Sequence, residues 1–154
     1  MPLRPDLASL HTWGFAEPGR LRDELTAAAL SGAKTTTASL RAEFEIEGEE
    51  LPVAGGREIL VDSADRPVAV VETISCRVTR LADVDDQHAI DEGEGYTNAA
   101  EFRVEHERYW NGYIDTIRAK LGDPTFALDD DTPVVLERFR VVERLDPDEG
   151  LSGG

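Results

Sequence analysis

Cysteine is nearly absent from this 154-residue chain. Cys76 is its one cysteine, which excludes an intramolecular disulfide and argues against a structural zinc site built from thiolates. No uninterrupted apolar run reaches the roughly 18 residues that a membrane-spanning helix needs, so we expect no membrane partner. The first residues, Met1 to Asp6, lack the apolar core of a secretory signal, and we therefore expect a cytoplasmic protein.

Basic residues are also scarce. The chain has 16 lysines and arginines against 32 aspartates and glutamates, a formal net charge of −16 at pH 7. Because lysine and arginine contacts to phosphates supply most of the affinity for long nucleic acids, this balance disfavours avid binding of duplexes or long RNA. A small ligand, or a single nucleoside that enters a cleft, remains compatible with the charge.

The composition is otherwise that of an ordinary soluble globular protein, with 40% hydrophobic and 31% charged residues. The length suits one domain. We expect this single domain to span residues 1–145. The segment 146–154, which contains proline, glycine and acidic residues, is expected to form a flexible C-terminal tail.

The hydrophobic pattern predicts a mixture of helices and strands. Helices are expected over 5–13, from just after Pro18 to Ser31 with Gly32 past the end, over 37–44 and over 99–121, with a short helix or helical turn between 81 and 92. Strands are expected over 57–62, 67–81 and 133–145, the first two joined by a turn at 63–66. There are too few βαβ units for a doubly wound sheet, so the pattern indicates the α+β class with a small curled sheet or barrel.

The loop after the second predicted helix carries the most informative residues, in the segment Gly32 to Ser39. It places Lys34 and Thr37 three residues apart directly after a helix. A loop lysine in a dry cleft can polarise a substrate oxygen when charged, or activate a hydroxyl such as that of Thr37 when neutral. A structural alternative stays open, because a lysine commonly follows a helix end and Thr37 would suit the N-cap of the next helix.

Together with three later segments, this motif resembles the ASCH domain family, a group of PUA-like β-barrels. The resemblance rests on Gly32-x-Lys34-x-x-Thr37 after an amphipathic helix, and it continues in order through His88 to Tyr96, Phe102 to Trp110 and Val134 to Phe139. It implies an α+β fold in which helices pack around a small PUA-like β-barrel. The common family pattern has an arginine two residues after the threonine. This chain has Ser39 there and Arg41 two residues further on, as in a Thr-Ala-Ser subgroup of bacterial members.

The resemblance also implies a chemistry, because some small ASCH proteins remove the acetyl group from N(4)-acetylcytidine with a lysine, a threonine and a glutamate. Carried over by motif, these residues are Lys34, Thr37 and Glu92. Thr37 would attack the acyl carbon, Lys34 would take its proton or polarise the carbonyl, and Glu92 would protonate the departing amine. The last role needs a raised pKa, which the neighbouring Asp91 and Glu94 would favour. The alternative for Glu92 is a solvated acidic loop.

Further ligand contacts are expected around this set, at Ser39, Glu94, Tyr96, Arg103, His106 and Trp110. Arg103, His106 and Trp110 recur at helical spacing, where an arginine beside an aromatic ring suits stacking on a base or contact with a phosphate. Core packing is the alternative for His106 and the aromatic residues. His11, His88 and His106 lack the spacing of metal ligands, so we expect no metal and no cofactor.

The sequence leaves three functions open. The first hypothesis is hydrolysis of an N-acylated nucleoside or a similar small molecule; the alternatives are a non-catalytic RNA- or nucleotide-binding module, as PUA-like barrels often are, and a ribonuclease. The expected partner is therefore a small-molecule or nucleoside ligand, with RNA as the alternative. Trp13 and Phe15, near the start of the motif helix, are expected to pack in the interior, with lining of the cleft as the alternative. The first hypothesis requires that Lys34 and Glu92 face one cavity.

Overall fold

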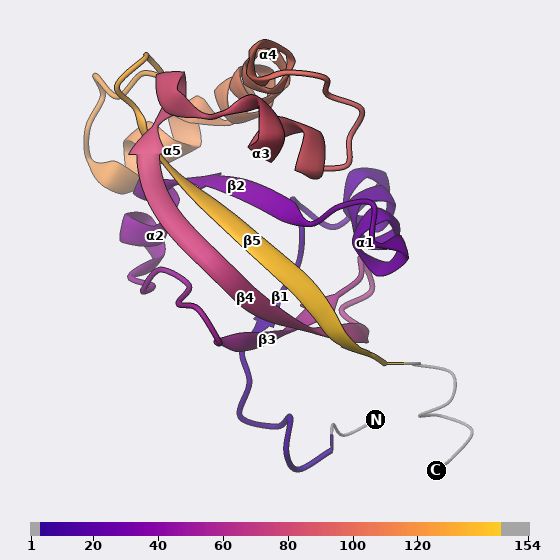
Figure 1. The fold of residues 1–154 in the computed structure, drawn as a ribbon. Coiled ribbons are helices and arrows are strands. Elements are labelled where there is room, and N and C mark those ends of the chain that lie inside the picture. The colour runs from indigo at the N-terminus through magenta and orange to yellow at the C-terminus, as the bar shows by residue number, and fades with distance from the viewer. Residues whose placement is uncertain (1–3, 146–154) are drawn as a thin grey trace.

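The computed structural model describes residues 4–145, and its mixture of helices and strands confirms the predicted α+β class (Figure 1). The strands are β1 (Thr12–Trp13), β2 (Thr36–Leu40), β3 (Arg57–Val61), β4 (Pro67–Arg80) and β5 (Pro133–Arg144). The helices are α1 (Arg20–Ser31), α2 (Arg41–Glu47), α3 (Asp86–Asp91), α4 (Ala99–Asn111) and α5 (Ile114–Leu121), with a short 3₁₀ turn at Leu81–Asp83. The predicted tail, residues 146–154, lies outside the described residues.

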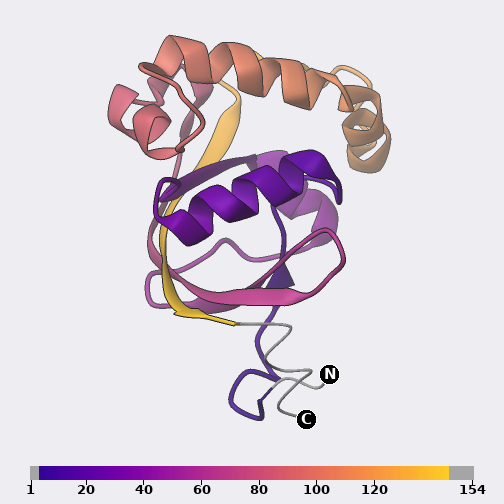
Figure 2. The same ribbon diagram turned by 90° about the vertical axis from the view of Figure 1, so that its right-hand side faces the viewer.

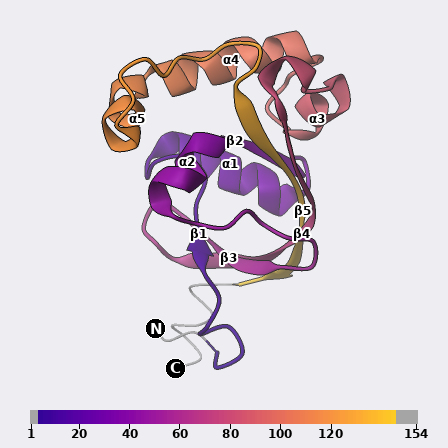
Figure 3. The same cartoon turned by 90° about the vertical axis from the view of Figure 1, so that its left-hand side faces the viewer.

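The strands form one curled sheet in the order β1-β3-β4-β5-β2 (Figures 1 and 3). Its centre is the antiparallel pair of β4 and β5, whose register shifts between Val70 and Val71 and again between Thr73 and Ser75. Such irregularities bend a strand pair and increase its twist. β1 adds to β3 in parallel, and β2 adds to β5 in the antiparallel sense. Within residues 4–145 these two edge strands are not paired with each other, so the sheet curls like a small barrel but remains open.

Helices pack against the curled sheet in two places (Figure 2). α3, α4 and α5 gather at one end, where Phe102 and Trp110 of α4 share a buried cluster with Leu40. α1 lies beside the sheet, and its Ala29 belongs to a second cluster with Phe139 of β5. Burying a large apolar side chain stabilises a fold by about 1.5–3 kcal/mol. These two clusters therefore set the positions of α4 and α1 relative to the sheet.

Two predicted helices are wrong because the chain pairs with distant strands instead. Residues 5–10 form turns, and Thr12–Trp13 is strand β1, paired with Ile59 and Leu60 of β3. In the segment 37–44, the residues up to Leu40 belong to strand β2, and helix α2 begins only at Arg41. Pairing with β5 along the whole of β2 outweighs the local helical pattern, and the β-branched Thr36 and Thr37 suit a strand.

The helix predicted over 99–121 is interrupted. α4 ends at Asn111 and α5 begins at Ile114, while Tyr113 between them has φ −132°, outside the helical range. Gly112, a poor helix former, immediately precedes the break. The helix ending at Ser31 and the strands β3, β4 and β5 are confirmed. None of the helices in the described part of the chain combines the length and the hydropathy that crossing a membrane requires.

Candidate functional site

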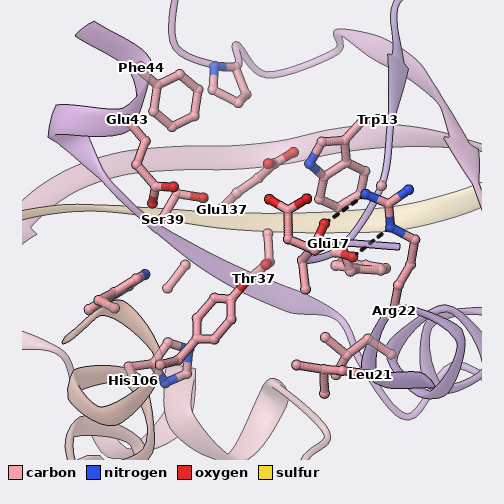
Figure 4. Close-up of a pocket in the computed structure, with 18 of the residues that line it drawn as sticks. Trp13, Glu17, Leu21, Arg22, Thr37, Ser39, Glu43, Phe44, His106 and Glu137 are labelled. Carbon is pink, nitrogen blue, oxygen red and sulfur yellow. Dashed lines mark hydrogen bonds between the residues drawn. The ribbon is translucent and has the colours of Figure 1, made fainter. Parts of the chain in front are cut away.

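A cavity of about 930 Å³ lies between the β1–α1 loop, strand β2, helix α2 and helix α4 (Figure 4). Its wall is acidic, because ten glutamates line it against one lysine, Lys34, and one arginine, Arg22. The Arg22 guanidinium is engaged by the main chain, since it donates to the carbonyls of Phe15 (2.9 Å) and Ala16 (2.7 Å). Aromatic side chains from four segments share the wall. The cavity therefore suits a ligand with an apolar or aromatic body and a neutral or positive charge.

Lys34 is held at the wall of this cavity, and its side chain is only 1% exposed. Its main-chain N–H donates to the carbonyl of Ala28 in α1 (3.0 Å). Its Nζ lies 2.9 Å from the carbonyl of Thr36, 3.2 Å from that of Glu92, and 3.4 Å from a carboxylate oxygen of both Glu92 and Glu94. Four oxygen acceptors surround the three N–H donors of a charged ammonium. Lys34 and Glu92, 58 residues apart, thus line the same cavity.

Glu92 ends helix α3 and is as deeply buried as Lys34, so it is not a solvated loop residue. One carboxylate oxygen lies 2.8 Å from Nε2 of His88, and the other lies 3.5 Å from Nε2 of His106. Burial raises the pKa of Glu92, but the Lys34 charge and the contacts with His106 and His88 outweigh it, so this pKa lies well below its ordinary value of 4.5. The predicted increase is therefore wrong for Glu92, because the Lys34 charge and the two histidine contacts outweigh the effect of burial.

The raised pKa is found two residues later, at Glu94. Its side chain is 23% exposed and contacts Nζ of Lys34 at 3.4 Å. Burial raises the pKa of Glu94, the Lys34 charge opposes this, and the negative charge of Glu92 adds to the increase. Glu94 rather than Glu92 thus has the electrostatic surroundings of a proton donor at the cavity wall.

Thr37 and Ser39 lie on one face of β2, and both line the cavity (Figure 4). Thr36 points to the other face, where its hydroxyl donates to the carbonyl of His88 (3.0 Å). Among the hydrogen bonds within residues 4–145, none involves the hydroxyl of Thr37, and none joins it to Lys34. Since no buried side-chain N or O atom of that region lacks a partner, the Thr37 hydroxyl is open to the cavity. It is placed to meet a ligand.

Tyr96, His106 and Trp110 also reach the cavity wall. The His106 ring stacks on Phe102 with the centroids 3.8 Å apart, and its Nδ1 donates to the Phe102 carbonyl (2.9 Å). This orientation directs Nε2 toward Glu92. Trp110 is almost wholly buried and packs edge-on against His106 (centroids 5.2 Å). His106 and Trp110 therefore both pack in the core and line the cavity, so the two alternatives stated for them are not exclusive.

Two arginines considered from the sequence lie elsewhere. Arg103 is not among the residues that line the cavity; its guanidinium pairs with Glu107 and Asp130, at 2.6 Å in each case. Arg41 does not line the cavity either, and its nearest carboxylate is that of Glu45, at 4.0 Å on α2. Ser39, which stands where the common family pattern has an arginine, lines the cavity, whereas Arg41 does not.

Several further residues line the cavity that were not among the expected site residues. Trp13 and Phe15 fulfil both the expected packing role and its alternative, because Phe15 belongs to the second buried cluster, Trp13 packs against it, and both line the cavity. Nζ of Lys34 lies 5.4 Å from the centroid of the Phe15 ring, within cation–π range. Glu43 and Glu137 line the cavity as well. Glu137 falls within the Val134 to Phe139 segment of the family resemblance, but β5 carries four further charged residues, so its charge alone does not single it out. Its neighbours follow only from the strand register.

Three residues that could bind a metal ion lie close together at this site, although their spacing in the sequence matches no metal-binding motif. Ligand atoms of Glu92, Glu94 and His106 all lie within 4.8 Å of one another. The Lys34 ammonium lies 3.4 Å from both carboxylates and already supplies a positive charge between them. A divalent cation would have to enter against that charge. We therefore interpret the cluster as an ion-pair network.

The sequence matches the family model of the ASCH domain over residues 11–143. The fold is similar to a crystal structure of protein EF3133 from Enterococcus faecalis V583, with a TM-score of 0.76, 23% identity, and coverage of 91% of this chain and 80% of that one. It is also similar to an ASCH domain from Lactobacillus crispatus JV V101, with a TM-score of 0.72, 22% identity, and coverage of 90% and 82%. These structures confirm the predicted PUA-like architecture. No curated protein matches the sequence.

Proposed function

The chain belongs to the ASCH domain family, and from this premise we propose that it is an amidohydrolase that removes an acyl group from a nucleoside or a similar small molecule. The observation that supports this most is the juxtaposition of Lys34, Glu92 and Glu94 in the cavity that Thr37 also lines. An amide hydrolase needs a nucleophile, a positive group for the developing oxyanion, and a proton donor for the leaving amine.

Each of these tasks has a candidate. The accessible hydroxyl of Thr37 attacks the acyl carbon. The Lys34 ammonium, fixed by four oxygen atoms, stabilises the negative charge that develops on the carbonyl oxygen. Glu94, whose pKa is raised by burial and by the Glu92 charge, protonates the leaving amine. Glu92 remains ionised and positions Lys34.

The central test is deacylation of N(4)-acetylcytidine and related N-acyl nucleosides by the purified protein. We expect turnover by the wild type and a loss of at least about 100-fold in kcat/KM for Thr37→Ala, because the nucleophile is removed. Thr35→Ala is the matched control. Thr35 lies two residues before Thr37 and does not line the cavity, and its hydroxyl contacts only the carbonyl of Asp91, at 3.4 Å, so the rate of this variant should stay near that of the wild type. Absent turnover, or equal rates for both variants, contradicts the proposal.

The acidic cavity wall predicts discrimination against phosphate. Ten lining glutamates outnumber the two lining basic residues, Lys34 and Arg22, so the wall as a whole repels an anionic substrate. We expect the 5′-monophosphate of N(4)-acetylcytidine to react with a kcat/KM at least about tenfold below that of the nucleoside, a difference of about 1.4 kcal/mol. Added salt should narrow the gap by screening the repulsion. Equal rates for the two compounds at low salt would show that the wall does not select by charge.

The RNA-binding alternative gains little from the described surface. Four of the five arginines of β4 and β5 pair with carboxylates, as Arg140 does with Glu72 (2.8 Å) and Arg138 with Asp91 (2.7 Å), which lowers the attraction for phosphates. The ribonuclease alternative gains no specific support either. His11 and His106 line the cavity, but the His106 ring is held by the Phe102 carbonyl and the Glu92 carboxylate, and His88 contacts Glu92 without lining the cavity. Salt-sensitive RNA binding together with absent deacylation would favour the binding module.

A further inference from the structure

Thr37 has a carboxyl group as its direct neighbour across the sheet. In the antiparallel pairing of β2 with β5, Thr37 lies opposite Glu137. Residues that oppose one another in this way share a face, with Cβ atoms about 5 Å apart. Both side chains line the cavity (Figure 4). The pairing therefore places the Glu137 carboxyl and the Thr37 hydroxyl as neighbours on the same wall of the cavity.

The surroundings of Glu137 leave part of its carboxyl group free. One oxygen accepts a hydrogen bond from the hydroxyl of Thr73 on β4 (2.7 Å), and no hydrogen bond within residues 4–145 involves the other. The titratable groups that face it are Glu58 from β3 and Cys76 from β4. Burial raises the pKa of Glu137 to about 7, the Thr73 hydrogen bond opposes this, and the Glu58 charge adds to it. The group therefore changes its protonation state in the neutral range.

Lys34 is poorly suited to take the proton of Thr37. Its Nζ has four oxygen neighbours within 3.4 Å, two of them carboxylate oxygens, and these favour a nitrogen that donates over one that accepts. We propose that Glu137 is the general base that activates the Thr37 hydroxyl, an inference that rests on the proposed amidohydrolase function. Lys34 then acts on the carbonyl oxygen alone.

The steps balance with the groups in the cavity. The Glu137 carboxylate takes the Thr37 hydroxyl proton, the threonine oxygen bonds to the acyl carbon, and the carbonyl electron pair moves to the oxygen beside Lys34. The C–N bond breaks and the amine takes a proton from Glu94. Water then attacks the Thr37 ester and gives a proton to the Glu94 carboxylate. The threonine oxygen leaves with the proton held by Glu137, which releases the carboxylic acid and restores both glutamates.

The pH profile of N(4)-acetylcytidine hydrolysis tests this assignment. In the wild type, kcat/KM should rise with pH through about 7, because the base must be ionised. Glu137→Gln should lower kcat/KM by about 100-fold or more and remove this limb. Thr73→Val removes the hydrogen bond that lowers the pKa of Glu137, so it should move the limb to higher pH. Glu143→Gln, on the same strand but outside the cavity, is the matched control with the wild-type profile.

A second readout does not need the natural substrate. Acylation of Thr37 by 4-nitrophenyl acetate, followed by mass spectrometry, should be rapid in the wild type and strongly slowed in Glu137→Gln. Thermal melting checks the folding of that variant. It should melt above the wild type at pH 8 and not at pH 4.5, because glutamine removes the cost of ionising a buried carboxyl. Turnover with an unchanged Glu137→Gln profile overturns the base assignment and leaves the hydrolase intact. Equal or absent Thr37 labelling overturns the assignment even if no nucleoside is hydrolysed.

Discussion

Replacing Lys34 with methionine is expected to destabilise the protein by about 3–5 kcal/mol and to abolish deacylation, because removal of one partner leaves a buried ion pair uncompensated. Lys34 and Glu92 are almost fully buried, the Glu94 side chain is partly exposed, and Lys34 contacts both carboxylates at 3.4 Å. Methionine is similar in size and therefore leaves little cavity. Urea denaturation measures the change as the difference in unfolding free energy at neutral pH.

Two controls separate charge from packing at Lys34. Adding Glu92→Gln to the methionine variant should recover part of the lost stability, so the two substitutions are expected to be strongly non-additive in a double-mutant cycle. The deficit should also shrink as the pH falls below about 4.5. The low pKa of Glu92 in the wild type gives stability that is present above its ordinary value of 4.5 and lost as the pH falls through the folded-state value. An additive cycle with a pH-independent deficit would show that Lys34 stabilises the fold by packing alone.

Substitution of Gly93 by alanine is expected to cost at least about 3 kcal/mol and to separate Glu92 from Lys34. Gly93 has φ +71°, a left-handed conformation that strains a residue with a side chain. A Cβ at this position would also lie 2.7 Å from the carbonyl carbon of Ala33 and 2.8 Å from Cα of Lys34. Both are main-chain atoms, so the loop can relieve the overlap only by moving away from the lysine. The measurements are unfolding free energy and deacylation rate.

Gly95→Ala is the matched control in the same loop. Gly95 also has a positive φ, +95°, but a Cβ there meets no atom within 4 Å. Only backbone strain applies, so the cost should be about 1–2 kcal/mol with most of the activity retained. If the two alanine variants lose equal stability and activity, close approach of Gly93 to the Lys34 turn is not what positions Glu92.

The features of the site that could be predicted from the sequence are short motifs, whose structure depends mainly on contacts between residues close together in the chain. The turn after α1 is set by Gly32, which ends the helix in a left-handed conformation (φ 86°) and brings Lys34 directly after it. The sequence also indicates the strands rich in β-branched residues and the acidic segment around Glu92. Resemblance to the ASCH family then joins these motifs into one expected site. Contacts within a few residues, together with the family pattern, were enough for these features.

The sequence pattern was enough to predict the α+β class, most of the elements and the interest of the Lys34 and Thr37 turn, and the family resemblance added Glu92 to these candidates. Only the tertiary structure decided the protonation chemistry, because a pKa depends on burial and on charges brought from distant segments. Lys34 and His106 reach Glu92 from other elements and lower its pKa, contrary to what its acidic neighbours suggest. The facing of Thr37 and Glu137 likewise depends on register, since a shift of one residue would turn either side chain to the opposite face.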